Sequence, residues 1–212
     1  RTLDIGADKK LDALPTDDEE NPALGVRGVR FCFRNPTIFR TQLRALCRAS
    51  ALGKLAVMIP MVVCADEVRR VRALLREVQN ELRYEEYPFD PAMPLGIMLE
   101  TPAAALMCDT LCEVCDFFSV GTNDLCQYTL AADRQNGGLA ALIEDNTEPV
   151  FRLIGAAADA VHRAGGGKWI GVCGELAADA SLTAKFLAAG ADELSVSPPY
   201  IAEIKEKIRS SV

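Results

Sequence analysis

The chain has 212 residues, half of them hydrophobic, so it can bury a sizeable core and is expected to form one domain. Its formal net charge of −7 argues against nucleic acid or an anionic membrane surface as a partner, because both attract surplus lysine and arginine. No window approaches 18 uninterrupted apolar residues, so we expect a cytoplasmic protein without membrane insertion.

Six short, continuously apolar runs indicate strands buried on both faces. In chain order they are residues 1–6, 55–61, 95–100, 117–121, 169–173 and 193–197. Stretches with helical periodicity separate or follow them, at residues 36–52, 65–84, 102–114, 148–164, 175–189 and 199–212. This alternation predicts an α/β fold with a parallel sheet, either open or closed into a barrel.

Polar side chains gather where these runs end. They are Asp4, Asp8, Glu100, Asn123, Asp124, Cys173 and Glu175. The carboxyl ends of parallel strands converge on one face, where both open and closed sheets bind their ligands. Carboxylates crowded around one cavity repel one another unless a cation lies between them. Oxygen ligands with positions left open for water suit Mg²⁺, which is commonly shared with a phosphate.

The two acids at strand ends each have a structural alternative. Glu100 precedes Thr101-Pro102, so its carboxylate also fits a role beside a helix N-terminus, where the dipole stabilises it by roughly 0.3–1 kcal/mol. Asp124 also fits a helix cap, in competition with its neighbours. Taken together, Glu100 and Asp124 favour a metal site.

Two arginines lie beside turns that contain glycine, Arg27 in "ALGVRGVR" and Arg134 in "ADRQNGG". A solvated arginine is the ordinary alternative for each. A phosphate or carboxylate ligand would want planar, bidentate donors of this kind, and these two are the best placed in the chain.

Eight cysteines show no compact disulfide pattern, and we expect them to be reduced. Cys173 precedes a glycine and the start of a predicted helix, a setting that favours thiol reactivity, although a buried structural thiol is the alternative. Cys108, Cys112 and Cys115 have a spacing that invites a zinc site, but the same spacing marks the buried stripe of a helix. His162 lies late in a helix and is expected on the surface.

The ordered motifs "RTLDIGADK", "ENPALGVRGVR", "GIMLETPAAA", "DFFSVGTNDLCQYTLAADRQN" and "WIGVCGELAAD" carry a family resemblance. The chain resembles the phosphoenolpyruvate-binding barrel of enzyme I, the phosphoenolpyruvate–protein phosphotransferase of the bacterial sugar phosphotransferase system. Pyruvate phosphate dikinase and phosphoenolpyruvate synthase share this barrel, but "GTNDLCQYTLAADR" and "GVCGELA" are closer to enzyme I.

The resemblance implies a (β/α)₈ TIM-type barrel and a set of site residues. Glu100 and Asp124 match the ligands of Mg²⁺, and Asp124 also belongs to the substrate site. Arg27, Asn123 and Arg134 match residues that bind phosphoenolpyruvate. Cys173 matches the thiol that protonates the enolate carbon as pyruvate forms. The parent enzyme passes the phosphoryl group to a histidine and then to a histidine-containing phosphocarrier protein, for sugar uptake.

Departures from the family pattern lead to further expectations. The family's barrel begins two strands earlier, with another substrate-binding arginine, so residues 1–212 would supply about six of eight strands. The swivelling phosphohistidine domain and the carrier-binding domain do not match any part of this chain. A homodimer is expected, because enzyme I dimerises through this domain. The alternatives are an inactive binding or dimerisation module, and the barrel of a dikinase or synthase relative.

Overall fold

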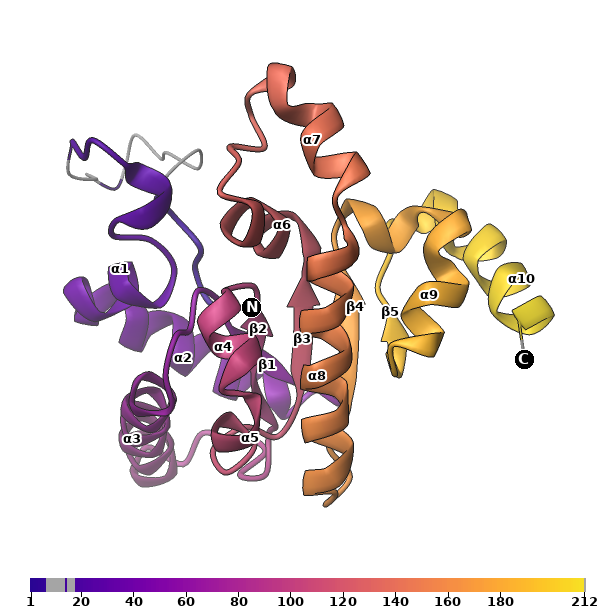
Figure 1. Ribbon diagram of the computed structural model, residues 1–212. Coiled ribbons are helices and arrows are strands. Elements are labelled where there is room, and N and C mark those ends of the chain that lie inside the picture. The colour runs from indigo at the N-terminus through magenta and orange to yellow at the C-terminus, as the bar shows by residue number, and fades with distance from the viewer. Residues whose placement is uncertain (7–13, 15–17, 212) are drawn as a thin grey trace. The chain divides into compact units, whose positions relative to one another are not determined.

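The computed structural model describes residues 1–6, 14 and 18–211 (Figure 1). The chain forms two compact units, Arg1–Ile97 and Met98–Val212, and the division falls inside one strand, β2 (Leu95–Leu99). Among the described residues, no helix has both the length and the apolar character that crossing a bilayer requires.

The N-terminal unit combines helices with a parallel strand pair. Its other elements are η1 (Pro22–Leu24), α1 (Val29–Arg34), α2 (Pro36–Ser50), β1 (Val57–Ile59) and α3 (Ala65–Tyr84). β1 and β2 run parallel, with Val57 opposite Leu95 and Ile59 opposite Ile97. Helix α2 packs against α3 and α1. The core of this unit is therefore built from apolar helix faces and fully buried strand residues.

Helix α3 follows directly from its sequence. Its buried residues Val68, Val71, Leu75, Val78 and Leu82 recur at alternating intervals of three and four, which places them along one face. The helix begins with a capping box in which the side chain of Cys64 accepts a hydrogen bond from the backbone. In return, Glu67 Oε2 accepts hydrogen bonds from the backbone N–H groups of Val63 (2.7 Å) and Cys64 (3.1 Å).

The C-terminal unit contains three parallel strands and most of the helices. Its strands are β3 (Phe118–Gly121), β4 (Ile170–Cys173) and β5 (Glu193–Leu194). Its α-helices are α4 (Pro102–Leu106), α5 (Cys108–Leu111), α6 (Thr122–Leu130), α7 (Ala140–Asp145), α8 (Glu148–Ala164), α9 (Thr183–Ala188) and α10 (Ile201–Ser211). Its 3₁₀ turns are η2 (Gly137–Leu139), η3 (Glu175–Ala178), η4 (Ala180–Leu182) and η5 (Pro198–Tyr200).

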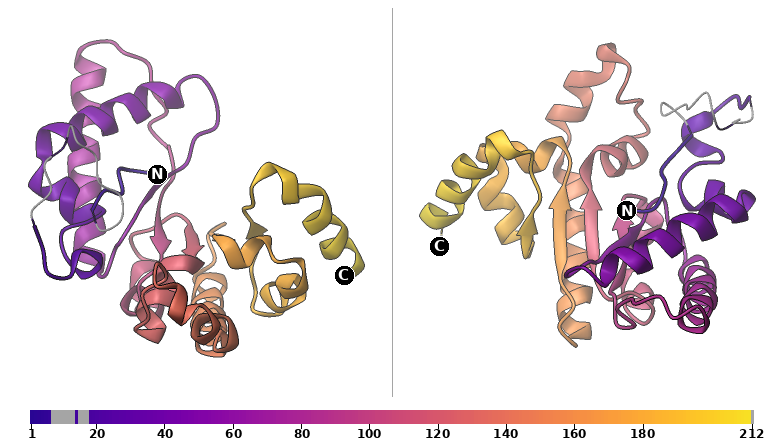
Figure 2. Two further views of the ribbon diagram at one scale, coloured as in Figure 1. Left: turned by 90° about the horizontal axis from the view of Figure 1, so that it is seen from above. Right: turned by 180° about the vertical axis from the view of Figure 1, so that it is seen from behind.

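The three strands of this unit lie side by side, β4 between β3 and β5 (Figure 2). Phe118 pairs with Ile170 and Gly121 with Cys173, so β3 and β4 end level with each other. Helix α6 starts directly after β3, and η3 starts one residue after β4. Helix α8 packs against α4, α5 and α6. The carboxyl ends of β3 and β4 are thereby brought next to two helix starts.

The predicted parallel α/β fold is confirmed by these strand pairings. The first predicted run, residues 1–6, forms no regular strand. Thr2 N donates to Met58 O (3.0 Å), but Leu3 N donates instead to the side-chain Oε1 of Gln42 (3.0 Å). The run thus has a backbone hydrogen bond to Met58 of β1 and another to a side chain of α2, and it does not form a regular strand.

Two predicted helices are interrupted. The helix expected at residues 102–114 ends at Leu106 and restarts at Cys108, because Met107 leaves helical geometry (ψ 21°). The helix expected at residues 175–189 becomes η3, η4 and α9. Asp179 breaks it, because its side chain accepts a hydrogen bond from Ser181 N (2.8 Å) and starts a new turn.

We predict that Glu67→Ala lowers the free energy of unfolding by about 1 kcal/mol, because two backbone donors at the start of α3 lose their acceptor. Urea denaturation followed by circular dichroism measures this. Asp66→Ala is the matched control, since it also removes an acid from the first turn but only an exposed pair with Arg69 (2.6 Å). Equal losses in the two variants would contradict a capping role for Glu67.

Candidate functional site

The ends of β3 and β4 carry the densest group of predicted residues. Asn123 and Asp124 lie in the first turn of α6, and Cys173 is the last residue of β4. Because Gly121 and Cys173 are paired in the sheet, the first turn of α6 and the thiol lie at one edge. The structure therefore brings Asn123, Asp124 and Cys173 into one neighbourhood, as the strand-end rule predicted.

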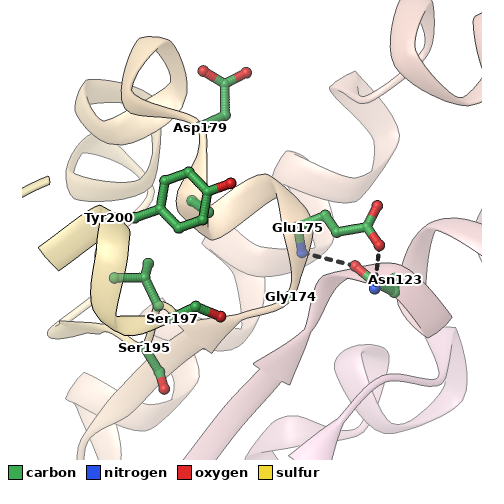
Figure 3. Close-up of a pocket in the computed structure, with 9 residues that line it drawn as sticks. Asn123, Gly174, Glu175, Asp179, Ser195, Ser197 and Tyr200 are labelled. Carbon is green, nitrogen blue, oxygen red and sulfur yellow. Dashed lines mark hydrogen bonds between the residues drawn. The ribbon is translucent and has the colours of Figure 1, made fainter. Parts of the chain in front are cut away.

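Hydrogen bonds tie the β4–η3 segment to the start of α6. Thr122 Oγ1 donates to the carbonyl oxygen of Cys173 (2.8 Å), and Glu175 N donates to Asn123 Oδ1 (2.9 Å). Asn123 Nδ2 in turn donates to Glu175 Oε1 (3.4 Å), as Figure 3 shows. We call these three hydrogen bonds the clasp. The clasp sets both the position of Cys173 and the direction in which the amide of Asn123 points.

Gly174 is needed for the clasp. Its φ of +97° lies in a region that other residues rarely adopt. A Cβ atom at this position would lie 2.3 Å from Thr122 Oγ1 and 2.8 Å from Asn123 Oδ1. Only glycine lets the two loops approach this closely.

Glu100 reaches the same strand end from the C-terminal end of β2. Its residue is 1% exposed, and a Cβ atom placed on Gly121 would lie 2.9 Å from Glu100 Oε2. Gly121 therefore makes room for this carboxylate. Glu100 is not the cap of the next helix, because Thr101 fills that role by accepting a hydrogen bond from Ala104 N (3.2 Å).

Asp124 is 5% exposed and is also not a cap. The N-cap position of α6 is Gly121, which has no side chain. Arg134 Nη1 lies 3.7 Å from Asp124 Oδ2, and Arg134 N donates to Gln127 Oε1 (3.1 Å). The structure thus places Arg134 against the first turn of α6, beside the predicted metal ligand.

Glu100 and Asp124 are both buried near one strand end, where removal from water makes an ionised carboxylate costly and nearby positive charge, such as that of Arg134 beside Asp124, lowers the cost. The oxygen donors of Glu100 and Asp124 fit Mg²⁺, which binds through one or two carboxylates and keeps positions open for water or phosphate. Within residues 1–6, 14 and 18–211, no group of three or more His, Cys, Asp or Glu side chains has metal-site geometry.

Arg27 belongs to the N-terminal unit, where it is 1% exposed. Its Nη2 lies 3.4 Å from both carboxylate oxygens of Asp4, another predicted strand-end residue. Burial and the negative charge of Asp4 raise the pKa of the Cys32 thiol to about 12, so this thiol stays protonated. Because both side chains are buried and within 3.4 Å of each other, Arg27 and Asp4 form a buried ion pair.

Asp8, the other acid predicted near the end of this run, lies outside the described residues.

The backbone on both sides of Arg27 is tightly packed. A Cβ atom on Gly6 would lie 2.7 Å from Arg27 Cβ, and one on Gly28 would lie 2.7 Å from Met61 Cβ. Gly28 N donates to Ile5 O (3.3 Å), which fixes the chain directly after the arginine. Met61 itself has a φ of +59°, which is unusual for a residue with a side chain. We call Gly6, Gly28 and Met61 the frame of Arg27.

A cavity of about 510 Å³ opens beyond the clasp (Figure 3). It is lined by Asn123, Gly174, Glu175, Ala178, Asp179, Ser195, Val196, Ser197 and Tyr200. Of the residues singled out in the sequence, only Asn123 and Glu175 line it. The hydroxyl groups of Ser195, Ser197 and Tyr200 were not predicted, although the strand-end rule applied to the run at residues 193–197 would have found the two serines.

The three clustered cysteines and His162 lie outside the candidate site. Cys108, Cys112 and Cys115 are buried, and burial, with the neighbouring Cys112 thiol, raises the pKa of Cys108, so these thiols pack as apolar side chains. The surface position predicted for His162 is confirmed. Its Nε2 lies 3.1 Å from Asp192 Oδ2, and 44% of its side chain is exposed.

Known proteins resemble this chain along its whole length. The family model described as "PEP-utilising enzyme, PEP-binding domain" matches residues 1–212. The phosphoenolpyruvate-protein phosphotransferases of Listeria monocytogenes and Staphylococcus carnosus are 44% and 45% identical to it over 209 and 210 residues. Each alignment covers 99% of this chain and 36% of the relative, so the chain spans about a third of the length of these curated relatives.

A crystal structure of a citrate lyase from Burkholderia xenovorans LB400 shares the fold. It matches with a TM-score of 0.58 at 17% sequence identity, covering 82% of this chain and 53% of that chain. At this identity the likeness concerns the α/β fold alone. The family match over residues 1–212 shows that the chain belongs to the PEP-utilising enzymes, as their PEP-binding domain.

Proposed function

We propose that the chain is the phosphoenolpyruvate- and Mg²⁺-binding portion of a phosphoenolpyruvate–protein phosphotransferase, which moves the phosphoryl group to a histidine and releases pyruvate. The observation that carries the proposal is the shared edge at which the clasp holds Asn123 and Cys173 beside the carboxylates of Glu100 and Asp124. An amide donor, a thiol and two acids are the groups that this reaction needs. The relatives named phosphoenolpyruvate-protein phosphotransferase support it.

Glu100 and Asp124 would hold Mg²⁺. When bound, the ion neutralises negative charge on the phosphoryl group that is being transferred. Both carboxylates are buried, and their oxygen atoms are hard donors of the kind that Mg²⁺ prefers.

Phosphoenolpyruvate would be held by Arg27, Asn123 and Arg134. A guanidinium group can donate two parallel hydrogen bonds to a phosphate or carboxylate, and an amide N–H adds a neutral donor. Asn123 accepts from Glu175 N through its oxygen and donates one N–H of Nδ2 to Glu175 Oε1, so the second N–H of Nδ2 is the donor for an anion. Arg134 has 23% of its side chain exposed, so a ligand can reach the side chain from solvent at its position beside Asp124.

Cys173 would act as the general acid. After the phosphoryl group has left, its thiol gives a proton to C3 of the enolate of pyruvate. The electron pair of the carbon–carbon double bond forms the new C–H bond, and the enolate oxygen becomes the carbonyl oxygen. The sulfur keeps the electrons of the broken S–H bond as a thiolate.

The receiving histidine and the phosphocarrier protein would act through other parts of the parent protein, in a cytoplasmic pathway of sugar uptake. Residues 1–212 would be its phosphoenolpyruvate-binding TIM-type barrel domain. We further propose that this domain forms a homodimer.

We predict that Mg²⁺ strengthens phosphoenolpyruvate binding to the chain, and that Glu100→Gln and Asp124→Asn each abolish this strengthening because they remove a charged ligand. Isothermal titration calorimetry with and without Mg²⁺ measures it. Glu144→Gln is the control, since this acid is exposed on α7. Equal affinity with and without the ion would contradict the metal site, and no binding under either condition would favour an inactive binding or dimerisation module.

Cys173→Ala should abolish the exchange of solvent deuterium into the methyl group of pyruvate, because the proton donor is gone, while phosphoenolpyruvate affinity stays the same. Proton NMR of the methyl resonance follows this exchange. Cys64→Ser provides the control, because Cys64 is the exposed thiol at the start of α3 and serine can still cap that helix. Undiminished exchange in Cys173→Ala would rule out this thiol as the acid.

Sedimentation velocity at micromolar concentration should give the mass of a dimer. Dilution should shift the boundary towards the monomer, because association depends on protein concentration. A well-folded monomer over the whole concentration range would contradict the proposed homodimer.

A further inference from the structure

Ser119 is a polar residue inside an otherwise apolar strand. Its neighbours in β3, Phe118 and Val120, are fully buried, whereas Ser119 itself is partly exposed. Its hydroxyl group donates a hydrogen bond to Cys173 Sγ at an Oγ–Sγ distance of 3.7 Å. A hydroxyl group in a strand core therefore points at the sulfur atom to which the proposed function gives the proton-donating role.

The register of the sheet explains why these two side chains meet. Ser119 pairs with Gly171, and Cys173 pairs with Gly121. Side chains of paired residues project to the same face, and so do residues two apart in a strand, so Ser119 and Cys173 occupy a diagonal on one face. The other two corners of this square are glycines. No third side chain from β3 or β4 lies between the hydroxyl and the thiol.

The backbone of Cys173 is also held in place by a hydrogen bond. Thr122 is fully buried, and its hydroxyl donates to the carbonyl oxygen of Cys173, which fixes the main chain of the thiol. The Ser119 hydroxyl then selects among the side-chain rotamers that remain. Two hydroxyl groups, that of Thr122 bonded to the backbone and that of Ser119 bonded to the sulfur, leave Cys173 little freedom.

We infer that Ser119 is a positioning residue for the proton-donating step, and this inference rests on the proposed function of Cys173. It orients the thiol before the proton leaves and donates a hydrogen bond to the sulfur afterwards. When the S–H bond breaks, its electron pair stays on sulfur as the new C–H bond forms at C3 of the enolate. A hydroxyl donor stabilises this thiolate more than it stabilises the neutral thiol, since sulfur accepts hydrogen bonds better when it is charged.

The first experiment does not depend on phosphoenolpyruvate. Iodoacetamide alkylation at neutral pH, with each cysteine quantified by peptide mass spectrometry, reports the reactivity of Cys173. Ser119→Ala should slow alkylation of Cys173 about threefold, because a smaller fraction of the thiol is ionised while each thiolate becomes somewhat more nucleophilic. Ser119→Thr, which keeps the hydroxyl group, should restore the rate. Exposed Cys64 is the internal standard and should react equally in all three proteins.

The second experiment follows the proposed reaction. Ser119→Ala should lower the rate of deuterium exchange into pyruvate while the dissociation constant of phosphoenolpyruvate stays unchanged, and Ser119→Thr should recover exchange.

An unchanged or faster alkylation of Cys173 in Ser119→Ala would overturn the role of Ser119. Slower alkylation that Ser119→Thr fails to restore would also overturn it, because it would indicate a packing effect. Absence of exchange in the unmodified chain would instead contradict the proposed function, while the alkylation result would still decide whether Ser119 controls the thiol.

Discussion

The pairing of Gly121 with Cys173 is the constraint on which the candidate site depends. It sets β3 and β4 to end at the same level, so that the first turn of α6 and the β4–η3 segment meet. It also puts a residue without a side chain where the carboxylate of Glu100 needs space. A register shifted by one residue would turn every side chain of β4 to the opposite face, and it would separate the thiol from Asn123.

The net charge of the chain is negative, yet both candidate arginines are held in local ion pairs. Each candidate arginine lies against a carboxylate: Arg27 against Asp4, and Arg134 against Asp124. Such pairs lower the cost of burying either charge, but they also reduce the positive potential available to an anionic substrate. A cation held by Glu100 and Asp124 would restore that potential. In the proposed function, metal and substrate therefore assist each other's binding.

The sequence predicted best the elements that a single local pattern determines. Helices α3 and α8 have the bounds expected from their apolar periodicity, because strong caps or a terminating glycine coincide with the end of each pattern. The helix at residues 102–114 was predicted as continuous, since nothing local marks the break at Met107. The eight-stranded barrel stays a prediction, because periodicity does not distinguish open from closed sheets.

For the site, the strand-end rule located Asn123, Asp124 and Cys173 without any contact information. It could not reveal the clasp, because Thr122 before a helix reads as an ordinary cap, and its bond to Cys173 spans 51 positions in sequence. The serines of the cavity were missed for a different reason: Ser195 and Ser197 lie inside the run predicted at residues 193–197, whereas β5 ends at Leu194 and leaves both serines beyond the strand end.

The frame of Arg27 has a thermodynamic consequence. A free arginine side chain carries about 2 kcal/mol of rotamer entropy, which an anion must normally overcome when it captures a solvated arginine. Gly6, Gly28 and Met61 confine the backbone around Arg27, and Asp4 holds its guanidinium group, so folding has already removed most of this freedom. Preorganisation of this kind would turn a larger share of the contact energy into affinity. The unfavourable backbone angle of Met61 is then part of the cost of a binding group that is ordered before its ligand arrives.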